Sequence, residues 1–340
     1  MRNRTLLLST LALGLVALAL VFTGRETPAP AAATTRPLVP AELLADLRAI
    51  EITANGKTAR VTRTEQGWVV PARCDLPVDA DNRLRPLLQS LRSAKVHGTL
   101  TADPRRIARL GLEGNLVRLE GADGKSWSAE FGRTTDDGLG AAVRLVGAKE
   151  ALATNFLGYL EGDPANWFDP ILFTVRPEEV LALDATFPDG SKVRIERAKE
   201  GAPFQGAEPK LLAASEDLLG ALVACRVTDA IDRAASPEAV AALANQAFVA
   251  KLTLKGDVTL TLRIAKAPAG KPGEPPRAWL TASHSDPANT LNRKCERAVF
   301  TCPGWMAEQL PGSTAELAKR MDAPAEAPAA PNIELVPAGR

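Results

Sequence analysis

The sequence predicts an α+β protein with two similar repeat units, each a mainly antiparallel sheet with helices packed on one face. Apolar residues alternate on both sides of Gly-containing turns, which is typical of β-hairpins. Apolar stretches with helical spacing lie between these hairpins. The same succession of features returns about 133 residues later in the chain of 340 residues. A repeated succession of this length indicates two copies of one supersecondary unit.

The chain begins with a basic head, residues 1–4, and a predicted transmembrane anchor, residues 5–23. The apolar run from Leu6 to Phe22 is roughly 26 Å long as a helix, near the lower limit for a hydrocarbon core of about 30 Å. Arg2 and Arg4 favour a cytoplasmic N-terminus. We therefore expect a single-pass protein of the inner (cytoplasmic) membrane, with the bulk of the chain periplasmic or otherwise extracytoplasmic. A cleaved signal peptide is the alternative, because small-residue sites follow at residues 29–33.

Residues 24–40 are rich in Pro, Ala and Thr and predict an extended tether. The first α+β unit is expected over residues 41–175. It opens with a hairpin from Ile50 to Trp68 that turns at Asn55-Gly56. A leucine helix follows, capped by Asp79 or Asp81, and Pro86 indicates that the helix proper starts near Arg85.

The first unit continues with a short helix from Asp103 to Gly111, which has a capping residue, a Pro at its first position and a Gly at its end. A second hairpin turns at Asp123-Gly124, and a further strand is expected around Val143. Trp68 and Trp127 continue the apolar alternation of their hairpins. Both are therefore predicted to be core residues.

The second α+β unit is expected over residues 176–312 and matches the first feature by feature. Its first hairpin turns at Asp189-Gly190, and its apolar helix runs from about Leu211 to Val227. A short helix from Ser236 to Asn245 precedes a hairpin that turns at Gly256-Asp257. Further strands are expected around residues 278–280 and 298–300. Residues 313–340 form a C-terminal segment that ends in a Pro/Ala-rich disordered tail from Asp322.

Composition excludes several classes of function. Lys plus Arg (41) nearly balances Asp plus Glu (40), so no basic field attracts nucleic acid. The sequence has only two histidines, His97 and His284, which disfavours zinc sites and histidine acid–base catalysis. We therefore expect no metal, no cofactor and no nucleic-acid partner.

Several motifs resemble a known family. They are Gln66-Gly67-Trp68-Val69-Val70-Pro71, then Leu76-Pro77-Val78-Asp79, a leucine helix, and Arg109-Leu110-Gly111-Leu112 before a strand. With the basic head and single anchor, this pattern resembles the bacterial family called domain of unknown function 4340, from the anchor to about Leu310. The resemblance implies an anchored envelope protein, and some members are associated with gliding-motility-type ABC transporters. It supplies no catalytic or binding residues, and Cys74 departs from the commoner pattern.

Three constellations could carry chemistry, and each has a simpler interpretation. Gly121 to Ser126 looks like part of a phosphate-binding loop, but Leu119 stands where the first glycine is needed, so a hairpin turn is favoured. The acidic pairs Asp79/Asp81 and Asp136/Asp137 could act in glycoside hydrolysis. A helix cap for the first pair and a solvated turn for the second are the favoured interpretations. His97 and His284 are isolated and support no triad.

The four cysteines are Cys74, Cys225, Cys295 and Cys302, and they allow three complete disulfide pairings. Cys295 and Cys302 flank a predicted strand, so about 23 Å would separate them in a straight chain, and a disulfide between them is disfavoured. No two cysteines have C-x-x-C spacing, which disfavours a metal site. The other pairings stay open.

These observations predict a non-catalytic accessory or scaffold protein, anchored in the membrane and belonging to an ABC-transporter-like envelope complex. Its partners would be the membrane, through the N-terminal helix, and other envelope or transporter proteins. The alternative is an extracytoplasmic module that binds a glycan or peptide in the groove between the two units. A hydrolase is the third hypothesis. We predict no catalytic, cofactor or metal-binding residues, and the sequence identifies no ligand-binding ones.

Overall fold

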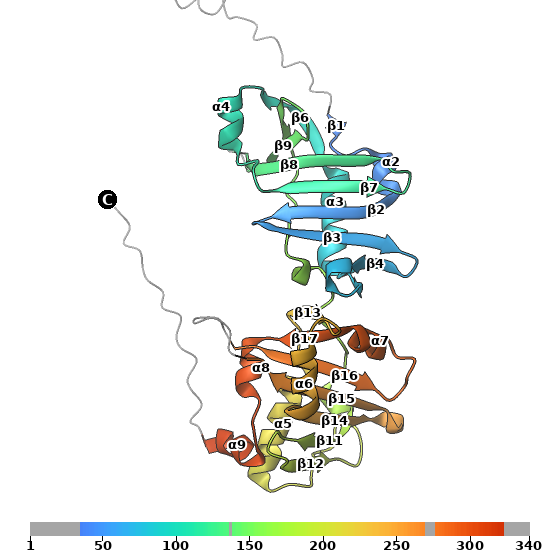
Figure 1. Ribbon diagram of the computed structural model, residues 1–340, viewed down its shortest axis with the longest axis vertical. Helices are drawn as coiled ribbons and strands as arrows, with labels where there is room; N and C mark the ends of the chain where they lie inside the picture. The colour runs from blue at the N-terminus through green and yellow to red at the C-terminus, as the bar shows by residue number, and fades with distance from the viewer. Residues whose placement is uncertain (1–34, 136–137, 269–275, 323–340) are drawn as a thin grey trace, which may run out of the picture.

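The computed structural model describes residues 35–135, 138–268 and 276–322. These residues form two antiparallel sheets with helices, and the two sheets lie end to end along the long axis (Figure 1). None of the helices within these ranges is long and apolar enough to cross a membrane. The predicted anchor at residues 5–23 and the tail beyond Asp322 lie outside the described residues.

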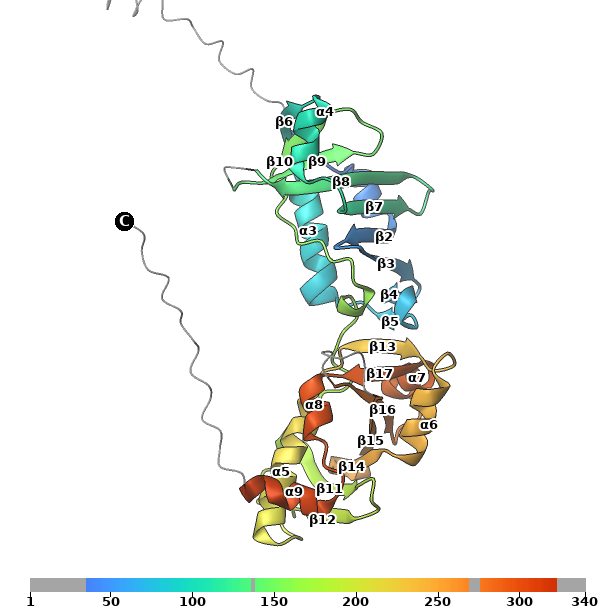
Figure 2. The ribbon, with the colours of Figure 1, turned by 60° about the vertical axis from the view of Figure 1, so that its left-hand side comes forward.

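The first sheet has the strand order β1-β6-β10-β9-β8-β7-β2-β3-β4-β5. Its strands are β1 Arg36–Pro37, β2 Leu47–Ala54, β3 Lys57–Thr64, β4 Gly67–Val70, β5 Leu76–Pro77, β6 Lys95–Thr101, β7 Leu116–Gly121, β8 Ser126–Thr134, β9 Ala141–Leu145 and β10 Ala151–Thr154. The helices of this part are α2 Ala41–Ala45, α3 Arg85–Ser93 and α4 Pro104–Ile107. Helix α3 lies along one face of the sheet (Figure 2).

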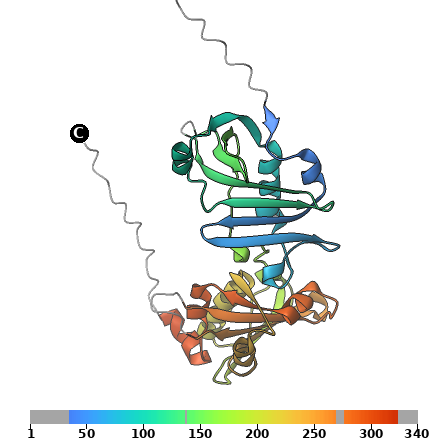
Figure 3. The same cartoon turned by 45° about the horizontal axis from the view of Figure 1, so that its top comes forward.

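The second sheet has the strand order β12-β11-β14-β15-β16-β17-β13. Its strands are β11 Val180–Thr186, β12 Lys192–Glu196, β13 Asp229–Asp232, β14 Phe248–Leu254, β15 Thr259–Lys266, β16 Ala278–His284 and β17 Ala298–Cys302. The helices are α5 Pro209–Val223, α6 Pro237–Asn245, α7 Thr290–Arg297, α8 Gly304–Gln309 and α9 Thr314–Lys319. Figure 3 shows this part of the molecule below the first sheet.

The predicted turns form as the sequence indicates. Asn55 and Gly56 both have positive φ, 53° and 73°, which is the conformation that a two-residue hairpin between β2 and β3 requires. Gly256 and Asp257 repeat it with φ of 75° and 59° between β14 and β15. Helix α3 begins at Arg85, with Pro86 in its first turn where a missing N–H costs nothing.

Several expectations are corrected by the structure. Residues 36–40, expected in the tether, belong to the fold: β1 pairs with β6, and Leu38 and Val39 are buried. Helix α5 ends at Val223 rather than near Val227, because the chain turns to become the edge strand β13. Trp68 and Trp127 are half-buried at the margin of the core rather than within it.

Helices lie on both faces of the second sheet, not on one. Alternate residues of its strands point to opposite sides, so Ile264 and Phe300 join the large core with α5, while Ala265 and Val299 face the other way. Helix α6 covers this second face: its Ala239 and Leu243 form one small apolar cluster with Ala265 and Val299. The reason is that β17 is buried along both of its faces, and Ala265 of β15 and Trp279 of β16 extend its second apolar face.

Candidate functional site

The segment between β10 and β11, here called the linker, connects the two sheets and hydrogen-bonds to both of them. Toward the first sheet, the Trp167 carbonyl accepts from the Asp79 N–H at 2.8 Å, and the Asp169 N–H donates to the Pro77 carbonyl at 3.3 Å. On the second side, the N–H of Val227, just before β13, donates to Pro170 at 3.0 Å. Trp167 and Phe168 are buried, and the apolar core continues through them into both parts. The linker is therefore a fixed part of the region where the two sheets meet, which we call the joint, rather than a loose connection.

Gly162 allows the linker to approach the β2–β3 hairpin closely. A Cβ on Gly162 would lie 2.4 Å from the carbonyl oxygen of Ala54 and 2.5 Å from that of Lys57. Both contacts are with backbone atoms, which cannot rotate away as a flexible side chain does. This position therefore requires glycine.

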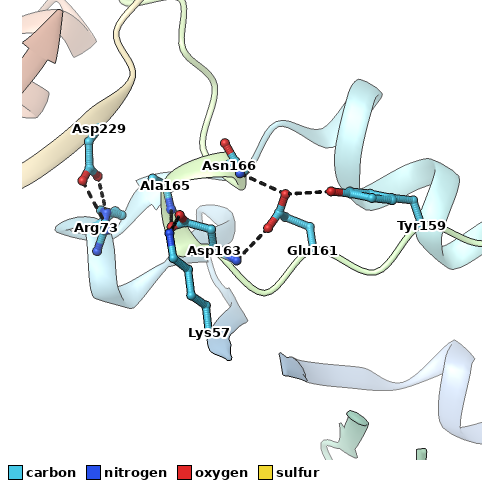
Figure 4. Close-up of polar contacts among 8 residues, drawn as sticks. All are labelled: Lys57, Arg73, Tyr159, Glu161, Asp163, Ala165, Asn166 and Asp229. Carbon is cyan, nitrogen blue, oxygen red and sulfur yellow. Dashed lines mark hydrogen bonds and ion pairs between the residues drawn. The ribbon is translucent and has the colours of Figure 1, made fainter. Parts of the chain in front are cut away.

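Glu161 is the centre of a polar cluster on the linker (Figure 4). Its side chain is nearly buried, with the residue only 9% exposed. One carboxylate oxygen accepts from the Asp163 N–H at 2.8 Å, and the other accepts from the Asn166 side-chain amide at 2.9 Å and the Tyr159 hydroxyl at 3.4 Å. The Trp167 indole N–H donates to the Glu161 carbonyl at 2.9 Å. These bonds hold the linker in one conformation.

Asp163 ties the linker to the hairpin through an ion pair with Lys57. It also caps the turn Pro164–Asn166 by accepting from the Ala165 N–H at 3.0 Å. Burial raises the pKa of Asp163, but the hydrogen bonds from Lys57 and Ala165 outweigh it, and the pKa lies below its usual value. The hydrogen bond to Asp163 raises the pKa of Lys57. Both groups are therefore charged at neutral pH.

Arg73 ties the first sheet directly to the second. It lies in the short turn Pro71–Arg73 after β4, and its guanidinium Nε donates to the carboxylate of Asp229, the first residue of β13. A second contact joins Arg73 Nη2 to the other Asp229 oxygen at 3.4 Å. The side chains of Arg73 and Asp229 are 22% and 35% exposed, so water screens the pair only in part.

A solvent-open groove of about 650 Å³ lies beside this ion pair. Its polar walls come from both parts of the molecule and carry charges of both signs; they are formed by Cys74, Asp75, Asp232, Arg233, Glu296 and Arg297. Cys74 and Asp75 both have left-handed backbone conformations, with φ of 58° and 55°. Such conformations are unfavourable for residues with a Cβ and often mark functional positions.

The Cys74 thiol is a poor nucleophile in this groove. Burial raises its pKa, and the nearby Asp232 carboxylate raises it further, so the thiol stays protonated at neutral pH. Reactive cysteines need the opposite environment. The groove can therefore hold a ligand through its charges, but Cys74 does not supply an activated thiolate.

The structure places the sequence-predicted acidic residues apart from the groove. Asp79 caps the turn before α3 by accepting from the Asn82 N–H at 3.0 Å, and Asp81 pairs with Arg85 at 2.8 Å. Asp79 and Asp81 therefore stabilise the start of the helical segment, as the capping interpretation predicts. Asp136 and Asp137 lie outside the described residues.

The segment from Gly121 to Ser126 is the turn between β7 and β8, as the sequence indicates. Asp123 accepts from the Lys125 N–H at 3.0 Å, and Gly124 has φ of 82°. His97 is exposed on β6, and the Nδ1 atom of His284 accepts from the Asp286 N–H at 3.0 Å. Over the described ranges no three His, Cys, Asp or Glu side chains are grouped as a metal site.

Sequence reasoning did not identify Glu161, Asp163, Arg73 or Asp229. Asp163-Pro164 is a recognisable start of a helical turn, but nothing in the sequence shows that its carboxylate reaches Lys57 across 106 positions. Arg73 and Asp229 are 156 positions apart. Their pairing depends on how the two sheets meet.

The fold and the joint define the class: an α+β protein of two antiparallel sheets, connected by a hydrogen-bonded linker and an ion pair. The family model described as "Domain of unknown function (DUF4340)" matches residues 68–246, and the chain belongs to this family. The matched segment covers the joint and parts of both sheets. No curated protein and no solved structure matches the chain.

Proposed function

We propose that the protein is a non-catalytic accessory or scaffold of an ABC-transporter-like envelope complex, anchored in the inner membrane with its folded part extracytoplasmic. The observation that carries this proposal is the joint. The linker bonds to both sheets, and Arg73 bonds to Asp229, so the two parts form one elongated body. A body of this kind holds bound partners at a fixed separation. The apolar run at residues 6–22 supplies the membrane attachment.

The outer side of helix α3 is the surface that best fits a partner. An open hollow of about 630 Å³ runs along it, with Leu84 and Leu88 at its base and Arg85 and Arg92 among its walls. The segment after β10 passes beside α3, and its Leu157 and Tyr159 are 65% and 69% exposed. Exposed apolar side chains rimmed by charges are typical of protein contact surfaces. The arginines favour an acidic partner segment.

Crosslinking in native membranes tests this surface. A photoreactive residue at position 89, within the hollow, should capture a membrane protein of the same complex. The substitution Leu157→Asp should weaken that capture, because it places a charge among the apolar contacts. Val146→Asp is the matched control, since Val146 is 59% exposed but lies in the turn after β9. Equal capture from both variants would remove this face from the proposal.

Attachment itself is the second test. Even a weak contact is favoured when a short tether holds both partners near the bilayer. A version released from residues 1–24 but correctly exported should fold and fail to complement a deletion strain. Asp79→Ala, Asp136→Ala and His284→Ala in the anchored chain should complement it. Full activity of the released form, or loss from one of those substitutions without unfolding, would reject the scaffold function.

The alternative function is binding of a peptide or glycan in the groove between the two parts. The observation that favours it is the mixed charge of the groove, with Asp75 and Asp232 near Arg233 and Arg297. Such walls suit a ligand that carries both charges, as a peptide does. Calorimetric titration with an envelope-peptide library tests it: binding that Asp232→Asn abolishes would favour this alternative over the scaffold.

We also propose that the two parts are copies of one fold. Seven neighbouring strands of the first sheet lie in the order β6-β10-β9-β8-β7-β2-β3, and the strands of the second lie in the order β13-β17-β16-β15-β14-β11-β12. If the strands of each set are renumbered along the chain, the two spatial orders are identical. Helices α3 and α5 occupy equivalent places in the chain, as do α4 and α6. An experimental structure in which either sheet has a different strand order would refute the repeat.

A further inference from the structure

Two buried cysteine sulfurs lie next to each other in the second part of the molecule. Cys225 follows the end of helix α5, and Cys302 is the last residue of β17, 77 positions later. Their Sγ atoms are 3.7 Å apart, and both residues are buried. A disulfide has a bond of about 2.05 Å, so the sulfurs need to approach by about 1.7 Å. Small rotations about the two Cα–Cβ bonds supply a movement of this size.

The other two cysteines have different surroundings. Cys295 Sγ accepts a hydrogen bond from the Ala282 N–H at 3.3 Å. Cys74 is half-buried in the groove at the joint. The sequence allows three complete pairings. The two that join Cys225 to Cys74 or Cys295 would separate the sulfurs of Cys225 and Cys302, which are the close pair. The geometry therefore selects one bridge and leaves two thiols.

We propose that Cys225 and Cys302 form a disulfide in the mature protein. The proposal rests on the extracytoplasmic placement proposed above, because disulfides persist in oxidising compartments and are rare in the cytoplasm. The oxidant is a disulfide donor of the thiol–disulfide oxidoreductase class. The Cys225 thiolate attacks one donor sulfur and forms a mixed disulfide, and the Cys302 thiolate then displaces the donor from Cys225. Two electrons and two protons pass to the donor, which leaves as a dithiol.

The environment of the pair supports this order of attack. The hydrogen bond from the Cys302 thiol lowers the pKa of Cys225 more than burial raises it. The same hydrogen bond and burial raise the pKa of Cys302. Cys225 is therefore the more readily ionised sulfur of the two. Because both are buried in the folded state, the exchange takes place during folding, after α5 and β17 have brought the two sulfurs together and before the rest of the core closes around them.

The bridge would fix the strand that makes the joint. Cys225 lies four positions before Asp229, the residue that bonds Arg73 of the first part. Between them, Val227 donates to Pro170 of the linker and Thr228 donates to Thr301 at 2.8 Å. A bond from Cys225 to Cys302 holds the start of the segment from Cys225 to Asp229 against the end of β17. The disulfide thereby restricts the position of Asp229 relative to the first sheet.

The experiment is thiol trapping of the full chain in native membranes. Acid quenching, alkylation with N-ethylmaleimide and non-reducing peptide mapping should find residues 225 and 302 linked, with Cys74 and Cys295 alkylated. In the mapped protein, dithiothreitol should lower the melting temperature by several degrees. The double variant Cys225→Ala/Cys302→Ala should show no such shift, whereas Cys74→Ser should keep it. Free thiols at both 225 and 302, in protein whose folded part is digested by external protease, would overturn the disulfide and leave the placement intact.

A second arm separates the pairing from the placement. The full chain is unfolded in urea and refolded in detergent with a glutathione redox buffer. A link between 225 and 302 supports the pairing wherever the protein lies in the cell. Links through Cys74 or Cys295 instead, or full alkylation of both 225 and 302, would overturn it. Protease protection of the folded part in spheroplasts, together with this link on refolding, would contradict the placement alone.

Discussion

The ion pair between Arg73 and Asp229 should stabilise the joint more than an ordinary surface pair does. Exposed pairs contribute about 0.2–1 kcal/mol, and hydrogen bonds to charged groups contribute about 1.5–3 kcal/mol. Arg73 and Asp229 are 22% and 35% exposed and make two N–H to oxygen contacts, so their coupling should lie between these limits. We expect a coupling energy of about 1 kcal/mol and a total cost of about 1.5–2 kcal/mol for Arg73→Ala.

A double-mutant cycle measures this coupling. Urea unfolding of the wild type, Arg73→Ala, Asp229→Ala and the double variant gives the interaction free energy without the other contacts of each side chain. The matched control is the cycle for Arg194 and Asp184, which pair within the second sheet with side chains 58% and 36% exposed. That cycle should give less than about 0.5 kcal/mol.

Salt distinguishes the two cycles further, because screening weakens exposed pairs more than partly buried ones. Raising the ionic strength from about 0.1 M to 1 M should remove most of the control coupling and leave more than half of the coupling at the joint. A joint coupling below about 0.3 kcal/mol, or one equal to the control at both salt concentrations, would refute the reasoning. The joint would then depend on the linker and its apolar contacts alone.

Three further outcomes are expected. Gly162→Ala should lower the free energy of unfolding in urea by about 1–3 kcal/mol, since the new Cβ meets two carbonyl oxygens. A Cβ at Gly98 would meet no atom within 4 Å, so Gly98→Ala should cost less than about 0.5 kcal/mol. Equal costs would contradict the close approach at Gly162. The lowered pKa of Asp163 means that its stabilising contribution is present above the unfolded value of about 3.9 and is lost as pH falls through the folded value, so Asp163→Asn should flatten the acid limb of the stability curve, and an unchanged limb would exclude this ion pair. Trp127→Ala should cost about 1–2 kcal/mol by thermal unfolding, because the side chain is only half-buried; a loss near 4 kcal/mol would place it in the core.

Local patterns in the sequence determined the elements that depend on neighbouring residues. Turn residues specify their own backbone conformation, so Asn55-Gly56 and Gly256-Asp257 marked two hairpins correctly. Caps act within a few positions, so Asp79 and Asp103 marked the starts of two helical segments. The family could be identified for the same reason, because its motifs are local. The strands β6, beside the edge strand β1, and β13, at an edge of the second sheet, were not expected, since neither has clear apolar alternation.

Only the tertiary structure decided how the two sheets meet. The partners of Arg73 and Lys57 lie 156 and 106 positions away, and no local spacing determines such contacts. The closeness of Cys225 to Cys302 likewise depends on β17 packing beside the end of α5. The second apolar face, covered by α6, also required the structure, because a buried strand with both faces apolar does not show which helix lies on which side. Local chemistry specifies turns, caps and strands, whereas the joint follows from packing between elements distant in sequence.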